Sequence, residues 1–185
     1  PFVRVISTLK ANKEWPPPEL CLDDSPVEYG ECSVEFNSVS YIFRKILKLV
    51  YSRIQELCND LELAKFVRPV YDTVRFIFAN HVDICWNRHV DHWMLCALYG
   101  VSRTVKKDIK FATIVDSYVV IRRSELGAVT CQRVVRQIQM EGPESFGNII
   151  QLYNQVFVPA TKTFLLNNKD LQEYNGVAVA KEDSI

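Results

Sequence analysis

The chain lacks the features that mark membrane or nucleic-acid-binding proteins. No apolar run approaches the roughly 20 residues that a membrane-spanning helix needs. The 22 lysines and arginines equal the 22 aspartates and glutamates, so the formal net charge is zero. No global electrostatic field therefore draws the chain to nucleic acid or to an acidic membrane. We expect neither membrane binding nor direct sequence-specific contact with nucleic acid.

The cysteines also lack the spacing of a redox or zinc motif, because no CxxC pair occurs. Several of them lie among apolar residues at helical spacing, where a thiol behaves as a small hydrophobic side chain. The pattern is typical of a reduced intracellular protein. The six are widely separated: Cys21, Cys32, Cys58, Cys85, Cys96 and Cys131.

Motifs for catalysis are missing as well: the chain has no GxSxG, no phosphate-binding P-loop and no HExxH. The nearest approach to a metal site is the C-x3-H-x2-H-x3-C spacing of Cys85, His89, His92 and Cys96, which lies along one helical stripe. A single rigid helix cannot wrap four ligands tetrahedrally around one zinc ion. We expect no enzyme activity and no cofactor, and keep a zinc enzyme using His89 and His92 as an alternative.

What the chain does have is apolar content at helical spacing. Hydrophobic residues make up 48% and aromatic residues 11%, enough for one globular domain with a core. Apolar side chains three and four residues apart predict several helices and few strands, hence an all-α fold. The predicted helices cover about 38–57 (capped by Ser38 or Ser40), 69–78 (beginning at Pro69), 87–101, 108–118 (capped by Asp108) and 145–158 (kinked or ended by Pro159).

Two further points of this prediction concern the central helix and a segment whose secondary structure stays undecided. The helix over 87–101 is apolar around most of its circumference, which is typical of the central helix of a bundle. Residues 128–140 fit either a helix or a short hairpin, and the pattern does not decide between them.

The first 35 residues differ from the rest. They carry seven acids against three bases, and their prolines, as in Trp15-Pro16-Pro17-Pro18, exclude a continuous helix. We interpret residues 1–12 as a short helix and 13–35 as a linker. The predicted organisation is therefore a segment and proline-rich acidic linker over 1–35, a helical domain over 36–167 and a tail over 168–185.

Four segments of the chain form one informative set: RHVDHWMLCALYGVSR over Arg88–Arg103, Asp108–Phe111, the IIQLYNQVF stretch over Ile149–Phe157, and a helix over Tyr41–Arg53. Together they resemble the second half (B-box) of the retinoblastoma-type pocket proteins. Their order and separations match the family between about Phe36 and Asn167. The resemblance implies a cyclin-like helical bundle around a central apolar helix, with a groove that binds LxCxE-type peptides.

The resemblance also implies a role for each groove residue. Tyr99, Tyr153 and Asn154 line the groove, with the Asn154 amide holding the peptide backbone. The remaining roles are the backbone N–H groups of Phe111 and Ala112 for the ligand glutamate, Ile150 for small apolar ligand side chains, and Arg103 and Lys162 for a basic rim. The glutamate site has independent physical support, because free N–H groups at a helix start favour a carboxylate. Arg103 stands where the family commonly has lysine.

From this resemblance we expect the chain to be a nuclear transcriptional corepressor and cell-cycle regulator. Its expected partners are chromatin regulators and repressor-complex subunits that carry LxCxE-like motifs. Others are the first half of the pocket (A-box) and, through the complete pocket, cell-cycle transcription factors. The main alternative is a divergent cyclin-like domain that binds a kinase or a general transcription factor through another surface.

Overall fold

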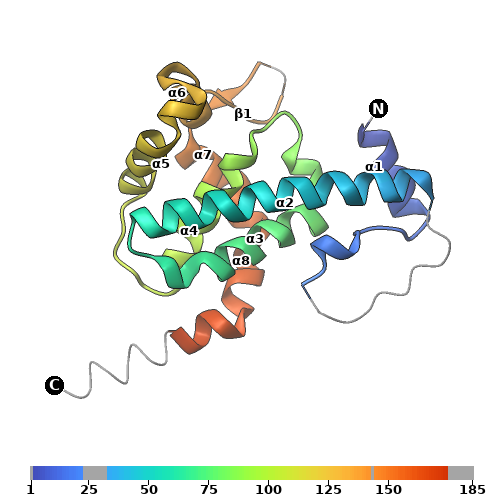
Figure 1. Ribbon diagram of the computed structural model, residues 1–185, viewed down its shortest axis with the longest axis horizontal. Helices are drawn as coiled ribbons and strands as arrows, with labels where there is room; N and C mark the ends of the chain where they lie inside the picture. Colours follow the sequence, from blue (N-terminus) through green and yellow to red (C-terminus); the bar gives the residue numbers. More distant parts are fainter. Residues whose placement is uncertain (1, 23–32, 143, 175–185) are drawn as a thin grey trace.

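The computed structural model describes residues 2–22, 33–142 and 144–174, and this part of the chain is almost entirely helical (Figure 1). The α-helices are α1 (Phe2–Ala11), α2 (Val34–Asp60), α3 (Val67–Asn80), α4 (Val90–Thr104), α5 (Phe111–Leu126), α6 (Ala128–Arg136), α7 (Ile149–Leu152) and α8 (Val158–Asn167). Short 3-10 turns are η1 (Pro18–Leu20), η2 (Ala64–Phe66) and η3 (Val82–Cys85), and η4 (Tyr153–Phe157) is a π-helical segment. The two-residue strands β1 (Ile138–Gln139) and β2 (Phe146–Gly147) pair antiparallel.

Helix α4 is the central helix, as predicted. Its residues 93–98 are all at most 1% exposed, and it packs against α2, α3, α5, α6 and α8. It begins at Val90 rather than near residue 87, because His89 caps it by accepting a hydrogen bond from the Asp91 amide. The all-α, cyclin-like bundle around a central apolar helix is thus the observed architecture.

The long helix α2 crosses the whole molecule (Figure 1) and buries the apolar face that its spacing predicts. The predicted cap, however, is wrong. Ser33 caps the helix by accepting from the Phe36 amide, whereas the Ser38 hydroxyl donates to the Val34 carbonyl within the helix. Several serines precede the apolar run, and spacing alone does not distinguish the cap from a serine inside the first turns.

The starts of α3 and α5 also differ from the prediction. Helix α3 begins at Val67, two residues before Pro69, and η2 leads into it. Helix α5 begins at Phe111 after Lys110, with no side chain capping it, so the predicted Asp108 cap is wrong. A turn in which the Lys107 amide donates to the Ser102 carbonyl places Asp108 before the helix start.

The segment over 128–140, left open by its pattern, contains both a helix and a strand. Helix α6 occupies its first part, and β1 then pairs with β2. The last predicted helix consequently starts later, at Ile149, where the Asn148 side chain accepts from the Ile150 and Gln151 amides.

Pro159 does not end this last helix. The chain stays helical through α7, η4 and α8 to Asn167. Directly before the proline the hydrogen bonds change register, so that the Val158 amide donates to the Tyr153 carbonyl five residues earlier. The register change accommodates a residue that has no N–H and cannot make a helical hydrogen bond.

Both ends of the described chain pack on the bundle. Helix α1, predicted over 1–12, buries Ile6 and Leu9, and the described part of the predicted linker (13–22) lies against α2 and α3. Residues 169–174 of the predicted tail are helical, with Leu171 buried. The rest of the predicted linker and tail lies outside the described residues.

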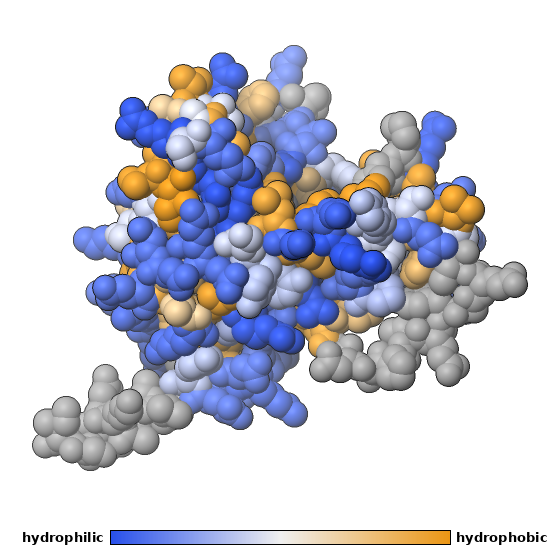
Figure 2. Space-filling model, in the orientation of Figure 1, coloured by the Kyte–Doolittle hydropathy of each residue, from blue (hydrophilic) through white to orange (hydrophobic). Residues whose placement is uncertain are grey.

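The face in Figure 2 is largely hydrophilic, with separate apolar patches. None of the helices in the described part of the chain combines the length and the apolar content of a membrane span.

Candidate functional site: an aromatic surface where three helices meet

Three predicted groove residues come together on the last turns of α4, the start of α5 and the start of η4. The Tyr99 ring stacks on the Phe111 ring, with centroids 4.6 Å apart and planes 11° apart. The Tyr153 ring meets Tyr99 edge-on at 5.0 Å and Phe111 at 5.8 Å. Aromatic pairs at these distances and angles stabilise a rigid surface beyond the effect of buried area alone.

The close approach of the last helix to α4 depends on Gly100. A Cβ atom at this position would lie 2.9 Å from Cε1 of Phe157 and 3.2 Å from Cδ1 of Leu165. Phe157 is fully buried and stacks on Tyr153 at 5.4 Å, so it supports the aromatic surface from below. Neither Phe157 nor Gly100 was among the predicted site residues. A glycine directly after Tyr99 in an otherwise apolar helix is the signal that indicates such a close contact.

Tyr153 keeps its proton. Burial raises the pKa of its hydroxyl to about 12, against a smaller opposing effect of the Arg103 charge. The Arg103 charge therefore acts on the aromatic cluster, although the Arg103 side chain itself is exposed. A half-buried neutral phenol offers both a donor and an acceptor to a ligand that covers it.

Asn154 and Ile150 flank Tyr153 on the outside of the last helix. Ile150 is 53% exposed, and Asn154 is exposed too. Among the residues that the structure describes, no group forms a hydrogen bond with the side-chain amide of Asn154. Tyr153 and Asn154 both lie in the π-helical segment η4, a conformation that often occurs at functional sites.

The start of α5 provides unpaired backbone donors beside this surface. The N–H groups of Phe111 and Ala112 lie in the first turn, where a helix provides no acceptor, and no side chain caps them. Three exposed lysines precede or begin this turn: Lys106, Lys107 and Lys110. Backbone donors, the helix dipole and nearby positive charge all favour a carboxylate at this position.

Of the eight predicted residues, Lys162 is the one least connected to the cluster. It lies exposed on α8, nine positions after Tyr153, and no contact in the described residues joins it to the aromatic rings. The structure brings Tyr99, Phe111 and Tyr153 into contact, and Ala112, Ile150, Asn154 and Arg103 lie beside them.

A second polar cluster, not predicted, lies at the other end of α4. Asp91, fully buried, accepts from Arg53 at 2.8 Å and from the Tyr118 hydroxyl at 2.7 Å. Arg53 also pairs with Glu125 at 2.5 Å. The cluster continues through Arg122, which pairs with Glu125 at 2.9 Å and with Glu56 at 2.6 Å. This cluster ties α2, α4 and α5 together.

His89 and His92 have a structural role at the same end. His92 Nδ1 accepts from the His89 amide, and its Nε2 lies 2.8 Å from the Val134 carbonyl oxygen. Burial lowers the pKa of His92 to about 4. Burial also raises the pKa of the Cys96 thiol well above its ordinary value. Within the described ranges, no group of three or more His, Cys, Asp or Glu side chains could hold a metal ion.

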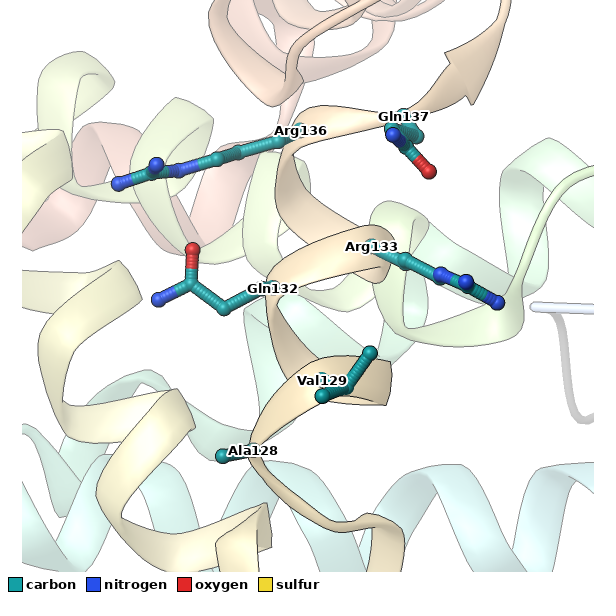
Figure 3. Close-up of a pocket in the computed structure, with 6 residues that line it drawn as sticks. All are labelled: Ala128, Val129, Gln132, Arg133, Arg136 and Gln137. Carbon is teal, nitrogen blue, oxygen red and sulfur yellow. The ribbon is translucent and has the colours of Figure 1, made fainter.

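A hollow of about 360 Å³ on the outside of α6 shares no residue with the aromatic surface. Figure 3 shows its lining, whose side chains project to both sides of α6. The lining residues are Ala128, Val129, Gln132, Arg133, Arg136 and Gln137. A smaller apolar hollow of about 210 Å³ lies where α2, α3, η3 and α4 meet. Neither holds a predicted groove residue.

Comparison with known proteins gives one consistent result. The retinoblastoma-associated protein B domain matches residues 38–162. Retinoblastoma-related protein 2 of Oryza sativa subsp. japonica is 34% identical over 147 residues, which is 77% of this chain and 14% of that protein. Retinoblastoma-related protein 1 of Arabidopsis thaliana is 30% identical over 169 residues, 84% of this chain and 16% of that protein. Retinoblastoma-related protein 3 of Zea mays is 31% identical over 153 residues, 77% of this chain and 14% of that protein.

Proposed function

Because this chain belongs to the retinoblastoma family and carries the B domain of its pocket, we propose that it captures LxCxE-type peptides on the aromatic surface of Tyr99, Phe111 and Tyr153. Proteins of this family are cell-cycle regulators and not enzymes. The chain spans about one seventh of the length of the relatives named above, so the activity of a whole protein is part of the proposal.

The observation that carries the proposal is the combination of an aromatic floor with unpaired polar groups at its edges. The half-buried rings of Tyr99 and Tyr153 form the floor, and the buried Phe111 ring packs against both. On one side lies the open start of α5, and on the other the exposed Asn154 amide. An extended peptide needs these two things: apolar contact for alternate side chains and hydrogen-bonding groups for its backbone and charge.

The proposed binding mode gives each residue the role that the family resemblance implies. The Asn154 amide both donates to and accepts from one peptide unit of the ligand. The small and apolar motif side chains lie on the tyrosine rings beside Ile150. The motif glutamate accepts from the first-turn N–H groups of Phe111 and Ala112. Arg103 contributes positive charge at the rim, with Lys162 farther out.

The partners that suit this mode are chromatin regulators and subunits of repressor assemblies that expose the motif. Residues 36–167 act as the B-box unit, with 1–35 preceding it and 168–185 as a tail. The A-box half of the pocket is a further partner, and through the complete pocket so are cell-cycle transcription factors. The working location of such a corepressor is the nucleus.

Isothermal titration calorimetry with two peptides tests the proposal. One contains LxCxE, and in the other alanine replaces the motif cysteine. We expect saturable 1:1 binding of the first and at least a tenfold loss for the second. Absence of binding to a sample whose circular dichroism shows folded helix would refute the groove and move the function to another surface.

A further inference from the structure

Residues 15–21, which lie outside the matched B domain, cover a face formed by α2 and α3. That match begins at residue 38. Figure 1 shows the segment, in blue, running from the end of α1 beside α2. Its turn η1 packs against both α2 and α3. The segment contacts these helices in the way a bound peptide does, through separate anchoring side chains and its main chain, and not as a continuous helix packed on its neighbours.

Two apolar side chains anchor the segment. The Trp15 ring meets Phe43 of α2 edge-on at 5.6 Å, and its indole N–H donates to the Ala79 carbonyl of α3 at 2.6 Å. Five positions later, Leu20 is fully buried. Buried aromatic and aliphatic anchors of this kind supply most of the binding energy in peptide recognition.

A charged anchor lies between them. The Glu19 carboxylate accepts from the Ser40 hydroxyl at 2.8 Å and pairs with Arg44 at 2.6 Å. Partial burial works to raise the pKa of Glu19, but the hydrogen bonds from Arg44 and Ser40 outweigh it, so the pKa lies below its ordinary value. The carboxylate is therefore held in its charged form.

The backbone of the segment is also gripped, through Arg75 of α3. Its Nε donates to the Glu19 carbonyl at 3.0 Å, and its Nη2 donates to the Cys21 carbonyl. Asp72 pairs with Arg75 at 3.2 Å and holds the guanidinium in place. An arginine that binds two main-chain carbonyls recognises an extended chain whatever its side chains, and the anchors then add selectivity.

We propose that the α2–α3 face formed by Ser40, Phe43, Arg44, Arg75 and Ala79 is a second linear-peptide docking surface, occupied in cis by residues 15–21. The partner that it fits is a proline-containing acidic segment with an aromatic residue four positions before a Glu-Leu pair, the W-x3-E-L pattern of Trp15, Glu19 and Leu20. Such a partner competes with the chain's own segment.

The competition has a definite scale. A tethered segment acts at an effective concentration on the order of millimolar, so a free peptide of equal intrinsic affinity is strongly disfavoured. Weakening the cis anchors increases the fraction of molecules in which the face is free. The apparent affinity for a peptide in trans rises in proportion to that fraction. This face is separate from the aromatic surface, so the inference does not rest on LxCxE binding.

The test titrates a fluorescent peptide of residues 13–22 onto three forms of the whole chain. They are the wild type, the double variant Trp15→Ala/Leu20→Ala, and the control Pro18→Ala, which changes an exposed residue of the same segment. We expect at least tenfold tighter binding to the double variant than to the other two. Adding Arg44→Glu to the double variant should abolish this binding, and a peptide with Glu19→Lys should restore it.

A folded double variant that binds the peptide no more tightly than the wild type would overturn the proposal and make the segment a structural brace only. If circular dichroism shows that the double variant does not fold, Glu19→Gln replaces it, with at least a threefold gain expected and an unchanged affinity as the contrary result. LxCxE binding measured on the same samples should be the same for all of them, so failure of one site is distinguished from failure of the other.

Discussion

The two ends of α4 differ in whether the polar groups there are buried and paired or exposed and unpaired. At the first turn, Asp91 is fully buried and both of its carboxylate oxygens are hydrogen-bonded, to Arg53 and to Tyr118. Near the last turn, Tyr99 packs on other rings, and the neighbouring Asn154 amide has no partner among the described residues. The carboxylate at one end is paired inside the protein, whereas the side-chain amide near the other end is exposed.

The difference separates what holds the fold from what is available to a ligand. A buried charge persists only when it is paired, and removing its partner leaves a large penalty. An exposed amide beside a rigid apolar surface contributes little to stability and gains a partner only when something binds. Mutations at the first end should therefore reduce stability, whereas mutations at the second should reduce binding.

The largest effect is expected at the buried end. Asp91→Ala leaves Arg53 with a buried and partly unpaired charge, and we expect a loss of about 3–5 kcal/mol in the free energy of unfolding. Urea unfolding followed by circular dichroism measures it. Asp83→Ala is the matched control, because this aspartate is largely exposed in a surface pair with Lys10 and its loss should change stability by less than about 1 kcal/mol. Equal effects of the two variants would contradict the contrast.

The pH dependence of stability should show the same buried end. Burial lowers the pKa of His92 to about 4 in the folded protein, against an ordinary value of 6.5. Protons therefore bind the unfolded chain more readily, and stability falls as the pH drops from about 6.5 to about 4, by up to about 3 kcal/mol. His92→Gln should remove this slope. Unfolding curves between pH 7 and pH 5 suit the test, because the glutamates with lowered pKa values, Glu14, Glu19 and Glu125, affect stability mainly at lower pH. An unchanged slope in the variant would count against a neutral buried imidazole.

At the exposed end, Asn154→Ala should act on binding alone. The ligand peptide unit loses both hydrogen bonds, and we expect an LxCxE peptide to bind about 1–3 kcal/mol more weakly. The free energy of unfolding should stay within about 0.5 kcal/mol, because the side chain is exposed. Fluorescence anisotropy gives the dissociation constant, with Gln155→Ala, its exposed neighbour, as the control. A dissociation constant unchanged in Asn154→Ala, or changed as much in the control, would exclude the assigned role.

The smallest effect belongs to the rim. Arg103→Ala and Lys162→Ala should each weaken the same peptide by about 0.2–1 kcal/mol, and Arg103 more than Lys162, because it lies beside the aromatic cluster. Raising the salt concentration from 50 mM to 500 mM should remove most of the difference, since exposed charges are screened. Lys169→Ala, exposed beyond α8, is the control. A loss that persists at high salt would indicate a direct and desolvated contact in place of a rim charge.

The sequence predicts the exposed end better than the buried one. Helical spacing indicates the central helix, and the family resemblance indicates Tyr99 and Tyr153, whose rings do meet. The pairing of Arg53 with Asp91 and Glu125 joins residues 38 and 72 positions apart, and no local pattern encodes it. Helix starts are wrong at Ser38 or Ser40 and at Asp108, because several capping residues stand near each start and tertiary packing decides among them.

The N-terminal segment shows a second limit of local patterns. The prolines after Trp15 correctly exclude a continuous helix there, but they do not indicate that the segment packs on α2 and α3. That contact depends on an indole and a carboxylate that meet partners 64 and 21 residues away, and on the burial of a leucine.

Hydrogen exchange measured by mass spectrometry, with and without a saturating LxCxE peptide, tests most directly where this domain binds its ligand. We expect slower exchange over residues 99–113 and 149–157, with no change around Asp91 or on the α2–α3 face. Slower exchange confined to α2 and α3 or to α6, or no change at saturation, would contradict it.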